Sequence, residues 1–235
     1  MTTIGIIPAR YHSSRLPGKP LLDILGKSMI QRVYEQAKES IIDELIVATD
    51  DQRIEAEVMA FGGQVMMTSQ KHKSGTDRCL EVLENINKKV DLVVNIQGDE
   101  PFICPSQINQ LINAFDKPSI KIATLAKLIE DKSVLSDEHT PKVQFDSEFW
   151  ATSFERLVNN ELNKTHYKHI GLYAYRSNTL KEIARLPQSK TERQLNLEQC
   201  RWLDHHYSIK ILLTKFDAYG IDTLGDLKKV IQRFG

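Results

Sequence analysis

The chain has 235 residues, of which 41% are hydrophobic and 26% are charged, ordinary proportions for a globular protein that buries a sizeable core. Lysine plus arginine number 31, as do aspartate plus glutamate, so no global field recruits nucleic acid or an anionic membrane. Any anion binding therefore has to be local.

The cysteines and the apolar segments indicate in which cellular compartment the protein works. Cys79, Cys104 and Cys200 are odd in number and lack metal-ligand spacing, which predicts free thiols in a reducing compartment. The first residues lack a basic start followed by an apolar core, and no apolar run approaches ~20 residues. We expect a cytoplasmic protein.

The first half of the chain alternates β-prone and amphipathic segments, which predicts a mostly parallel sheet flanked by helices. Strands are expected at 4–7, 45–48, 64–67 and 92–95. Helices are expected at 28–40, 52–61 and 76–87, and another begins near Cys104. The first helix carries apolar residues at helical spacing, which form a stripe that faces the core.

From about residue 119 the rhythm changes to strands with little helix between them, at 121–126, 142–145, 149–154 and 171–175. This pattern predicts an inserted antiparallel or mixed subdomain at roughly 127–176, with loops at 137–141 and 158–166. Helices return at 179–185 and 192–204, followed by a strand at 209–213 and a terminal helix near 224–234. We predict a single α/β domain over residues 1–235, with a Rossmann-like, mostly parallel sheet and this smaller insertion.

Positive charge concentrates in the loop after the first strand. Arg10, Arg15 and Lys19, with Gly18 for backbone freedom, are suited to surround a polyphosphate, because arginine offers a planar fork of donors and lysine a compact charge. An exposed basic loop between strand and helix is the alternative interpretation.

Two carboxylates follow predicted strands. Asp99 comes directly after the apolar strand 92–95 and Gln97-Gly98, and Asp222 lies between the last strand and the terminal helix. Because ligands bind beyond the carboxyl ends of parallel strands, Asp99 should face the same crevice as residues 8–19 and is a natural Mg²⁺ ligand. A tight turn at Asp99 and a helix cap at Asp222 remain the structural alternatives.

The segment 73–78 opens a predicted helix. Its backbone N–H groups can bind base or phosphate oxygens, although a plain Ser or Thr cap explains the same residues. Neither G-x-x-x-x-G-K-[ST] nor G-x-G-x-x-G occurs, which disfavours a P-loop or a dinucleotide-binding fold. The histidine pairs 166/169 and 205/206 lack partners at zinc-ligand spacing.

Several motifs in order resemble the 3-deoxy-manno-octulosonate (Kdo) cytidylyltransferases, also called CMP-Kdo synthetases. They are Pro8-Ala9-Arg10, Ser14-Arg15-Leu16-Pro17-Gly18-Lys19-Pro20-Leu21, Gly26-Lys27-Ser28-Met29-Ile30, Val47-Ala48-Thr49-Asp50-Asp51, Met67-Thr68, Ser74-Gly75-Thr76-Asp77-Arg78, Asn95-Ile96-Gln97-Gly98-Asp99-Glu100-Pro101, His169-Ile170-Gly171-Leu172-Tyr173-Ala174-Tyr175-Arg176, Leu197-Glu198-Gln199 and Ile221-Asp222-Thr223. Nearly the whole chain is covered.

The resemblance implies a nucleotidyltransferase-type fold and a reaction of CTP with a 3-deoxy-2-ulosonic acid to give the CMP-sugar and pyrophosphate, for lipopolysaccharide biosynthesis. It implies that Mg²⁺ is held by Asp99 and Asp222 and that Arg10, Arg15, Lys19 and Asp99 are catalytic. It assigns the nucleotide to Pro8, Ala9, Arg10, Arg15, Lys19, Ser74, Gly75, Thr76 and Arg78. It assigns the acidic sugar to Gln97, Arg156, His169, Tyr173, Glu198 and Gln199. From the residues alone, His169 is a candidate structural histidine, and Glu198 and Gln199 belong on a solvated helix face. A homodimer is also implied, with the insertion as lid or dimer platform.

The chain departs from the family pattern on the acceptor side. Family members typically carry Phe-Ser-Arg followed by a Pro-containing segment, whereas this chain has Phe154-Glu155-Arg156 and a short stretch at 157–163. We interpret Glu155 as a partner for the ammonium of an 8-amino Kdo analogue. The alternatives are an enzyme for another nonulosonate such as sialic acid, or a non-catalytic nucleotide-binding relative.

Overall fold

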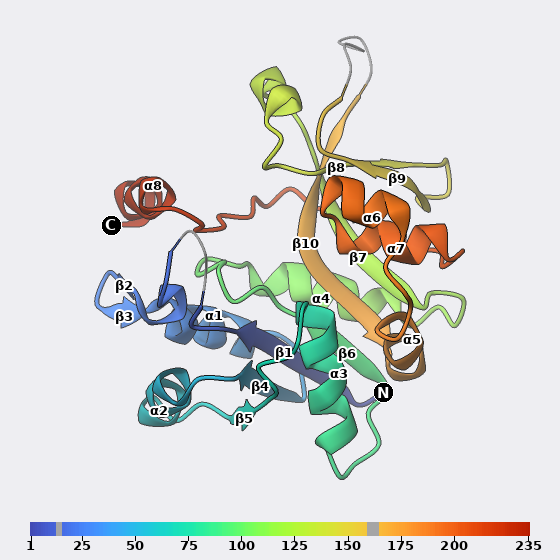
Figure 1. The fold of residues 1–235 in the computed structure, drawn as a ribbon. Coiled ribbons are helices and arrows are strands. Elements are labelled where there is room, and N and C mark those ends of the chain that lie inside the picture. The colour runs from blue at the N-terminus through green and yellow to red at the C-terminus, as the bar shows by residue number, and fades with distance from the viewer. Residues whose placement is uncertain (13–15, 159–164) are drawn as a thin grey trace.

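The computed structural model describes residues 1–12, 16–158 and 165–235 (Figure 1). Its main sheet has the strand order β11-β7-β10-β6-β1-β4-β5. The bounds are β1 (Thr3–Ala9), β4 (Glu44–Thr49), β5 (Val65–Met67), β6 (Leu92–Asn95), β7 (Ile122–Leu128), β10 (Tyr167–Arg176) and β11 (Lys210–Leu213). Neighbours in this order are parallel, except that β10 runs antiparallel to both β6 and β7. The predicted α/β class with a mostly parallel sheet is confirmed.

Helices cover both faces of the sheet. They are α1 (Met29–Lys38), α2 (Gln52–Ala60), α3 (Gly75–Asn85), α4 (Pro105–Ala114), α5 (Ser177–Ile183), α6 (Lys190–Leu195), α7 (Glu198–Asp204) and α8 (Leu224–Phe234), with short 3-10 turns η1 (Lys19–Leu21) and η2 (Lys132–Ser136). Apolar residues of α1, α2 and α4 pack on one face, and those of α3, α5 and α7 pack on the other. Strand β1 is buried between the two layers, and this explains why its sequence is a continuous apolar run.

The segment 127–176 contributes to two parts of the sheet. The hairpin β8 (Lys142–Phe145) and β9 (Ala151–Glu155) pairs with the first residues of β10, where Tyr167 lies opposite Val143. Figure 1 shows β10 as a long curved strand that continues from this hairpin into the main sheet, where it pairs with β6 and β7. A small separate hairpin is formed by β2 (Asp23–Ile24) and β3 (Lys27–Ser28). The role of the insertion as a lid or dimer platform stays a prediction.

Two elements differ from the sequence-based expectation by more than a shift of one or two residues at an end. The helix expected at 192–204 is divided into α6 and α7, because Asn196 adopts a left-handed conformation with φ of 51° that ends α6. Strand β10 begins at Tyr167 rather than 171, since its polar first residues find pairing partners on β7 and β8. Within the described ranges, no helix is long and apolar enough to cross a membrane.

Candidate active site

The first loop of the site lies where the parallel strands β1 and β6 end. The loop after β6 passes against the end of β1 so closely that a Cβ at Gly98 would lie 2.8 Å from the carbonyl oxygen of Pro8. Gly18, with φ of 71°, precedes η1, which begins at Lys19. Glycine is thus required at positions 18 and 98, in the two loops that bring Lys19 and Asp99 together.

Lys19 joins the two predicted carboxylates. Its Nζ donates to Asp99 Oδ2 at 2.8 Å and to Asp222 Oδ1 at 2.9 Å. The backbone N–H of Ile221 also donates to the carbonyl oxygen of Asp99 at 3.0 Å, so the two loops are held by main chain as well. Burial lowers the pKa of Lys19, but the two carboxylates outweigh it and the pKa is raised, which keeps the ammonium charged.

Asp222 does not cap the terminal helix. The side chain of Thr223 accepts the hydrogen bond from the Asp226 backbone N–H and forms a capping box with it. The Asp222 carboxylate is thereby available to Lys19. This geometry fits the interpretation of Asp222 as a metal-binding carboxylate better than the alternative of a helix cap.

A cavity of about 360 Å³ opens beside these residues. It is lined by Pro8, Ala9, Arg10, Lys19, Pro20, His72, Lys73, Ser74, Gly75, Arg78, Gln97, Gly98, Asp99 and Asp222. Eight of the nine residues that the resemblance assigned to the nucleotide are described, and all but Thr76 line this cavity. Arg15 lies outside the described residues. We call this the phosphate cavity, because it gathers cationic side chains from the segment after β1, the loop after β5 and helix α3.

The segment 73–78 has two roles in the wall of the phosphate cavity. Ser74 is the N-cap of α3 in a capping box with Asp77, so the plain-cap interpretation holds for its side chain. Arg78 is buried and bonds Asp50 Oδ2 at 3.0 Å and Thr68 Oγ1 at 2.5 Å. Its guanidinium is therefore fixed in orientation by two neighbouring strand ends.

A second cavity of about 830 Å³ adjoins the first. Thr76, His169, Tyr173, Glu198 and Gln199 line it, and Gly75, Gln97 and Asp222 line both cavities. We call it the acceptor cavity. The shared residues show that the two cavities meet beside the Lys19–aspartate cluster.

The wall of the acceptor cavity carries buried polar atoms with unmade hydrogen bonds. Among the residues that the structure describes, seven buried side-chain atoms lack a partner, and six of them belong to residues of this cavity. They are Asn95 Oδ1, Tyr173 Oη, Tyr175 Oη, Glu198 Oε1, Gln199 Nε2 and Trp202 Nε1. Because an unsatisfied buried polar atom is costly, such a cluster suits a ligand that carries several hydrogen-bond donors and acceptors.

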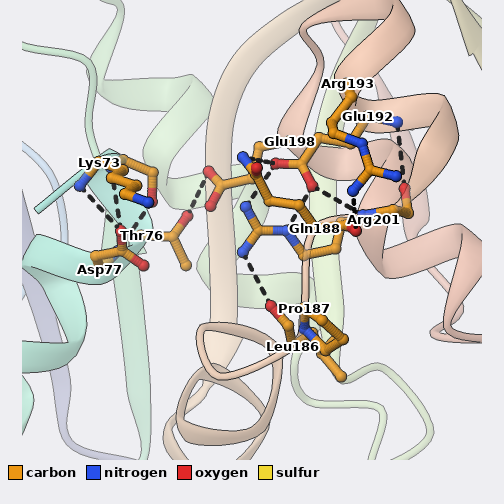
Figure 2. A network of polar contacts seen from close by, with 12 residues as sticks. Lys73, Thr76, Asp77, Leu186, Pro187, Gln188, Glu192, Arg193, Glu198 and Arg201 are labelled. Atoms are coloured by element: carbon orange, nitrogen blue, oxygen red, sulfur yellow. Dashed lines mark hydrogen bonds and ion pairs between the residues drawn. The ribbon is translucent and has the colours of Figure 1, made fainter.

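Burial favours the uncharged form of both Glu198 and His169. Glu198 Oε2 accepts a hydrogen bond from Thr76 Oγ1 at 2.8 Å (Figure 2), and burial raises the pKa of Glu198. Burial lowers the pKa of His169 to about 3, so its imidazole is neutral at physiological pH, and its Nε2 lies 3.1 Å from Thr124 Oγ1. The prediction that Glu198 and Gln199 lie on a solvated helix face is wrong, because the first residues of α7 face inward.

Some residues of the acceptor cavity were not among the predicted ligands. Asn95, Tyr175 and Trp202 supply unpartnered polar atoms, and Glu100 is buried with its pKa raised to about 8 by burial and the neighbouring Asp99 charge. Asn95 and Glu100 flank the Gln97-Gly98-Asp99 motif, so proximity to it was the available signal. The sequence around Trp202 contained no such signal, because the position of this side chain depends on how α7 packs.

Two predicted residues lie elsewhere. Arg156 is absent from the lining of both cavities as the described residues form them, and its guanidinium donates to three backbone carbonyl oxygens. Glu155 accepts hydrogen bonds from Gln144 and Ser153 on the β8–β9 hairpin, and it lines neither cavity as described. The geometry therefore does not bring Glu155 to an acceptor in the cavity.

Comparison with known proteins identifies the family. A model of the cytidylyltransferases matches residues 4–211. A 3-deoxy-manno-octulosonate cytidylyltransferase of Parabacteroides distasonis is 49% identical over 98% of this chain and 97% of its own length, and one of Bacteroides thetaiotaomicron is 51% identical over 97% and 96%. A solved CMP:2-keto-3-deoxy-manno-octonic acid synthetase, complexed with CTP, is 40% identical with a TM-score of 0.93 over 99% of this chain and 98% of that one. The chain therefore belongs to the 3-deoxy-manno-octulosonate cytidylyltransferases, within the cytidylyltransferase family.

Proposed function

We propose that this enzyme activates Kdo with CTP, forming CMP-Kdo and pyrophosphate for lipopolysaccharide biosynthesis. The single observation that carries the proposal is the pair of joined cavities, one cationic and one lined by unpartnered polar atoms, which meet at Gly75, Gln97 and Asp222. A nucleoside triphosphate and a polyhydroxylated acid fit these two chemistries. The names of the relatives supply the identity of both substrates.

The phosphate cavity supplies the binding of CTP. Arg10 and Lys19 present cationic groups from the segment after β1, Lys73 presents one from the loop after β5, and Ser74 and Gly75 bring the N-terminus of α3 into the same lining. Arg78, fixed by Asp50, is suited to hold one ligand group in a single orientation. We propose that Arg15 adds to this cationic rim.

The acceptor cavity supplies the binding of Kdo. Gln97, Tyr173, Glu198 and Gln199 offer donors and acceptors for the hydroxyls and the carboxylate of the sugar. The neutral His169 imidazole offers a hydrogen-bonding nitrogen rather than a charge, since its Nε2 is already bonded to Thr124 Oγ1. These groups select by hydrogen bonding, which discriminates strongly against an acceptor that leaves them unpaired.

We propose Asp99 and Asp222 as the residues that hold Mg²⁺. The two carboxylates converge on one cation, the Lys19 ammonium, and Mg²⁺ uses one or two protein carboxylates together with phosphate oxygens and water. Among the described residues, no group of three or more His, Cys, Asp or Glu side chains converges to form a larger metal site. When bound, the ion would neutralise phosphate charge and make a coordinated hydroxyl more acidic.

The reaction joins the two cavities. The anomeric hydroxyl of Kdo attacks the α-phosphorus of CTP and gives up its proton to solvent, the bond from that phosphorus to the bridging oxygen breaks, and pyrophosphate leaves in line. The protein orients the two substrates across the boundary at Gln97 and Asp222, while Arg10 and Lys19 stabilise charge on the phosphates. No covalent enzyme intermediate is required.

Pyrophosphate release tests the proposal. Purified enzyme with CTP and MgCl₂ should release pyrophosphate with Kdo, and parallel reactions with its 8-amino analogue and with sialic acid test the acceptor. Asp99→Asn should lose nearly all turnover and retain CTP binding by calorimetry, because the carboxylate acts on the metal. Release with sialic acid and none with Kdo would refute the assigned acceptor, and wild-type turnover by Asp99→Asn would refute the metal assignment.

We further propose a cytoplasmic homodimer. The three cysteines are free thiols, which suits a reducing compartment. Leu128, Leu157 and Leu213 are large apolar side chains that are exposed in the single chain. Sedimentation velocity should give a mass near twice that of the chain, and a monomer at micromolar concentration would contradict this.

A further inference from the structure

Arg156 joins two walls of the acceptor cavity without entering it. Its Nη1 donates to the carbonyl oxygen of Glu138 at 2.8 Å, and its Nε and Nη2 donate to those of Leu195 and Asn196 at 2.5 and 3.0 Å. The first acceptor lies within the loop 137–141, whose Asp137, His139, Thr140 and Pro141 line the cavity. The other two immediately precede Leu197, Glu198 and Gln199, which also line the cavity.

Lys142 reinforces the same connection from within the hairpin. Its side chain is buried, and its Nζ donates to the carbonyl oxygens of Asp137 at 2.5 Å and Arg156 at 2.8 Å. A buried ammonium is costly unless its donors are used, so this lysine has a structural reason to hold both segments. Arg156 and Lys142 together bind the loop 137–141, the end of β9 and the α6–α7 junction into one unit.

The α6–α7 junction needs such a support. Carbonyl groups in the last turn of a helix lack intrahelical partners, and Asn196 turns the chain by its left-handed conformation. The guanidinium satisfies the carbonyls of Leu195 and Asn196 in a rigid fork and so fixes the angle at which α7 begins. The first two residues of α7 are Glu198 and Gln199.

We propose that Arg156, supported by Lys142, is a positioning residue that sets the separation of the two walls of the acceptor cavity and thereby the placement of Glu198 and Gln199. It acts on acceptor binding and not on CTP. The proposal rests on the proposed function only for the identity of the acceptor, because the connection between the walls is a property of the protein itself.

Arg176 provides a matched control. Its guanidinium also donates to three backbone carbonyl oxygens, those of Phe115, Lys117 and Ile120, and it lines neither of the two cavities as described. The experiment compares wild type, Arg156→Gln, Arg156→Lys and Arg176→Gln by steady-state kinetics in both substrates, with thermal unfolding of each variant. Amide hydrogen exchange of residues 137–141 and 197–199 is followed in the absence of substrates.

Arg156→Gln should raise the KM for Kdo at least tenfold and change the KM for CTP less than twofold. Its amides at 137–141 and 197–199 should exchange at least tenfold faster. Arg156→Lys should be intermediate, since one ammonium cannot reach all three carbonyls in the fixed fork. Arg176→Gln should lose a similar amount of thermal stability and leave both KM values and these exchange rates within twofold of wild type.

Equal changes in both KM values, or unchanged exchange at 137–141 and 197–199 in Arg156→Gln, would overturn the proposal. A rise in the KM for Kdo without faster exchange would mean that Arg156 contacts the substrate directly, which also overturns it. Failure of the proposed function is distinguishable: wild type would then release no pyrophosphate with Kdo, whereas the exchange difference between the Arg156 and Arg176 variants would persist.

Discussion

Replacing Lys19 with methionine tests the charge balance at the centre of the site. The change keeps an apolar stem and removes the ammonium that lies within 3 Å of both Asp99 and Asp222. The two carboxylate oxygens are therefore less than about 6 Å apart, and their mutual repulsion is roughly 1–3 kcal/mol for effective dielectric constants between about 80 and 20. Both side chains are partly exposed, at 30% and 43%, so the lower end of this range applies.

In the absence of substrates, Lys19→Met should lower the melting temperature by about 2–4 °C per kcal/mol of lost stability in a domain of this size. Mg²⁺ should restore it, because the ion no longer competes with an ammonium for the two carboxylates. Saturation at about 100 times the Kd would contribute about 2.7 kcal/mol. Wild type should respond to Mg²⁺ alone much less, and the variant should lose turnover and CTP affinity.

The assay is thermal unfolding at matched ionic strength with and without ~10 mM MgCl₂, a concentration chosen for a weak carboxylate site. Lys73→Met, which removes the same charge from another wall of the phosphate cavity, is the control and should respond to Mg²⁺ like wild type. An equal Mg²⁺ response in wild type and Lys19→Met would refute the competition of ion and ammonium for Asp99 and Asp222.

Three further predictions concern buried groups and a close backbone approach. Glu192→Gln removes the ionic partner of the buried Arg201 guanidinium (Figure 2) and should lower the free energy of unfolding by about 3–5 kcal/mol in urea denaturation; a loss below about 1 kcal/mol would contradict a buried pair. The pKa of His169 is about 3 when folded and about 6.5 when unfolded, so the unfolded chain binds more protons between these values. Stability should therefore fall as pH drops from about 6.5 toward 3, and a chemically denatured series at several pH values should show a shallower fall for His169→Gln. Gly98→Ala places a Cβ 2.8 Å from the Pro8 carbonyl oxygen and should reduce turnover while the far-ultraviolet circular dichroism is retained; undiminished turnover would show that the two loops can separate without consequence.

Local sequence patterns located most of the elements. The apolar strand at 92–95, the strand at 142–145 and the terminal helix at 224–234 have the bounds that their patterns predict, because each is delimited by its own turn or capping residues. The start of β10 and the division of the helix expected at 192–204 could not be read in this way. The first depends on pairing with distant strands, and the second on a left-handed Asn196 that packing and Arg156 stabilise.

The residues of the site likewise divide into those that the sequence indicates and those that only the structure places. The motif residues around Lys19 and Asp99 were visible as charged and glycine-containing loops after apolar strands, and the resemblance extended this to Asp222. The inward orientation of Glu198 and Gln199 was not visible, because a short polar helix start has the same composition whether it faces water or a cavity. The position of Arg156 behind the cavity was equally hidden, since its partners are backbone carbonyls that carry no sequence signal.

The sequence by itself determined the class of the sheet and the loops that carry positive and negative charge, because strand alternation, glycine positions and charged residues are local properties of the chain. Only the tertiary structure decided that Lys19 lies between two aspartates 123 positions apart, with Nζ bonded to both, and that two cavities meet beside them. The physical reason is that this convergence depends on the order and direction of the strands, which no short segment encodes.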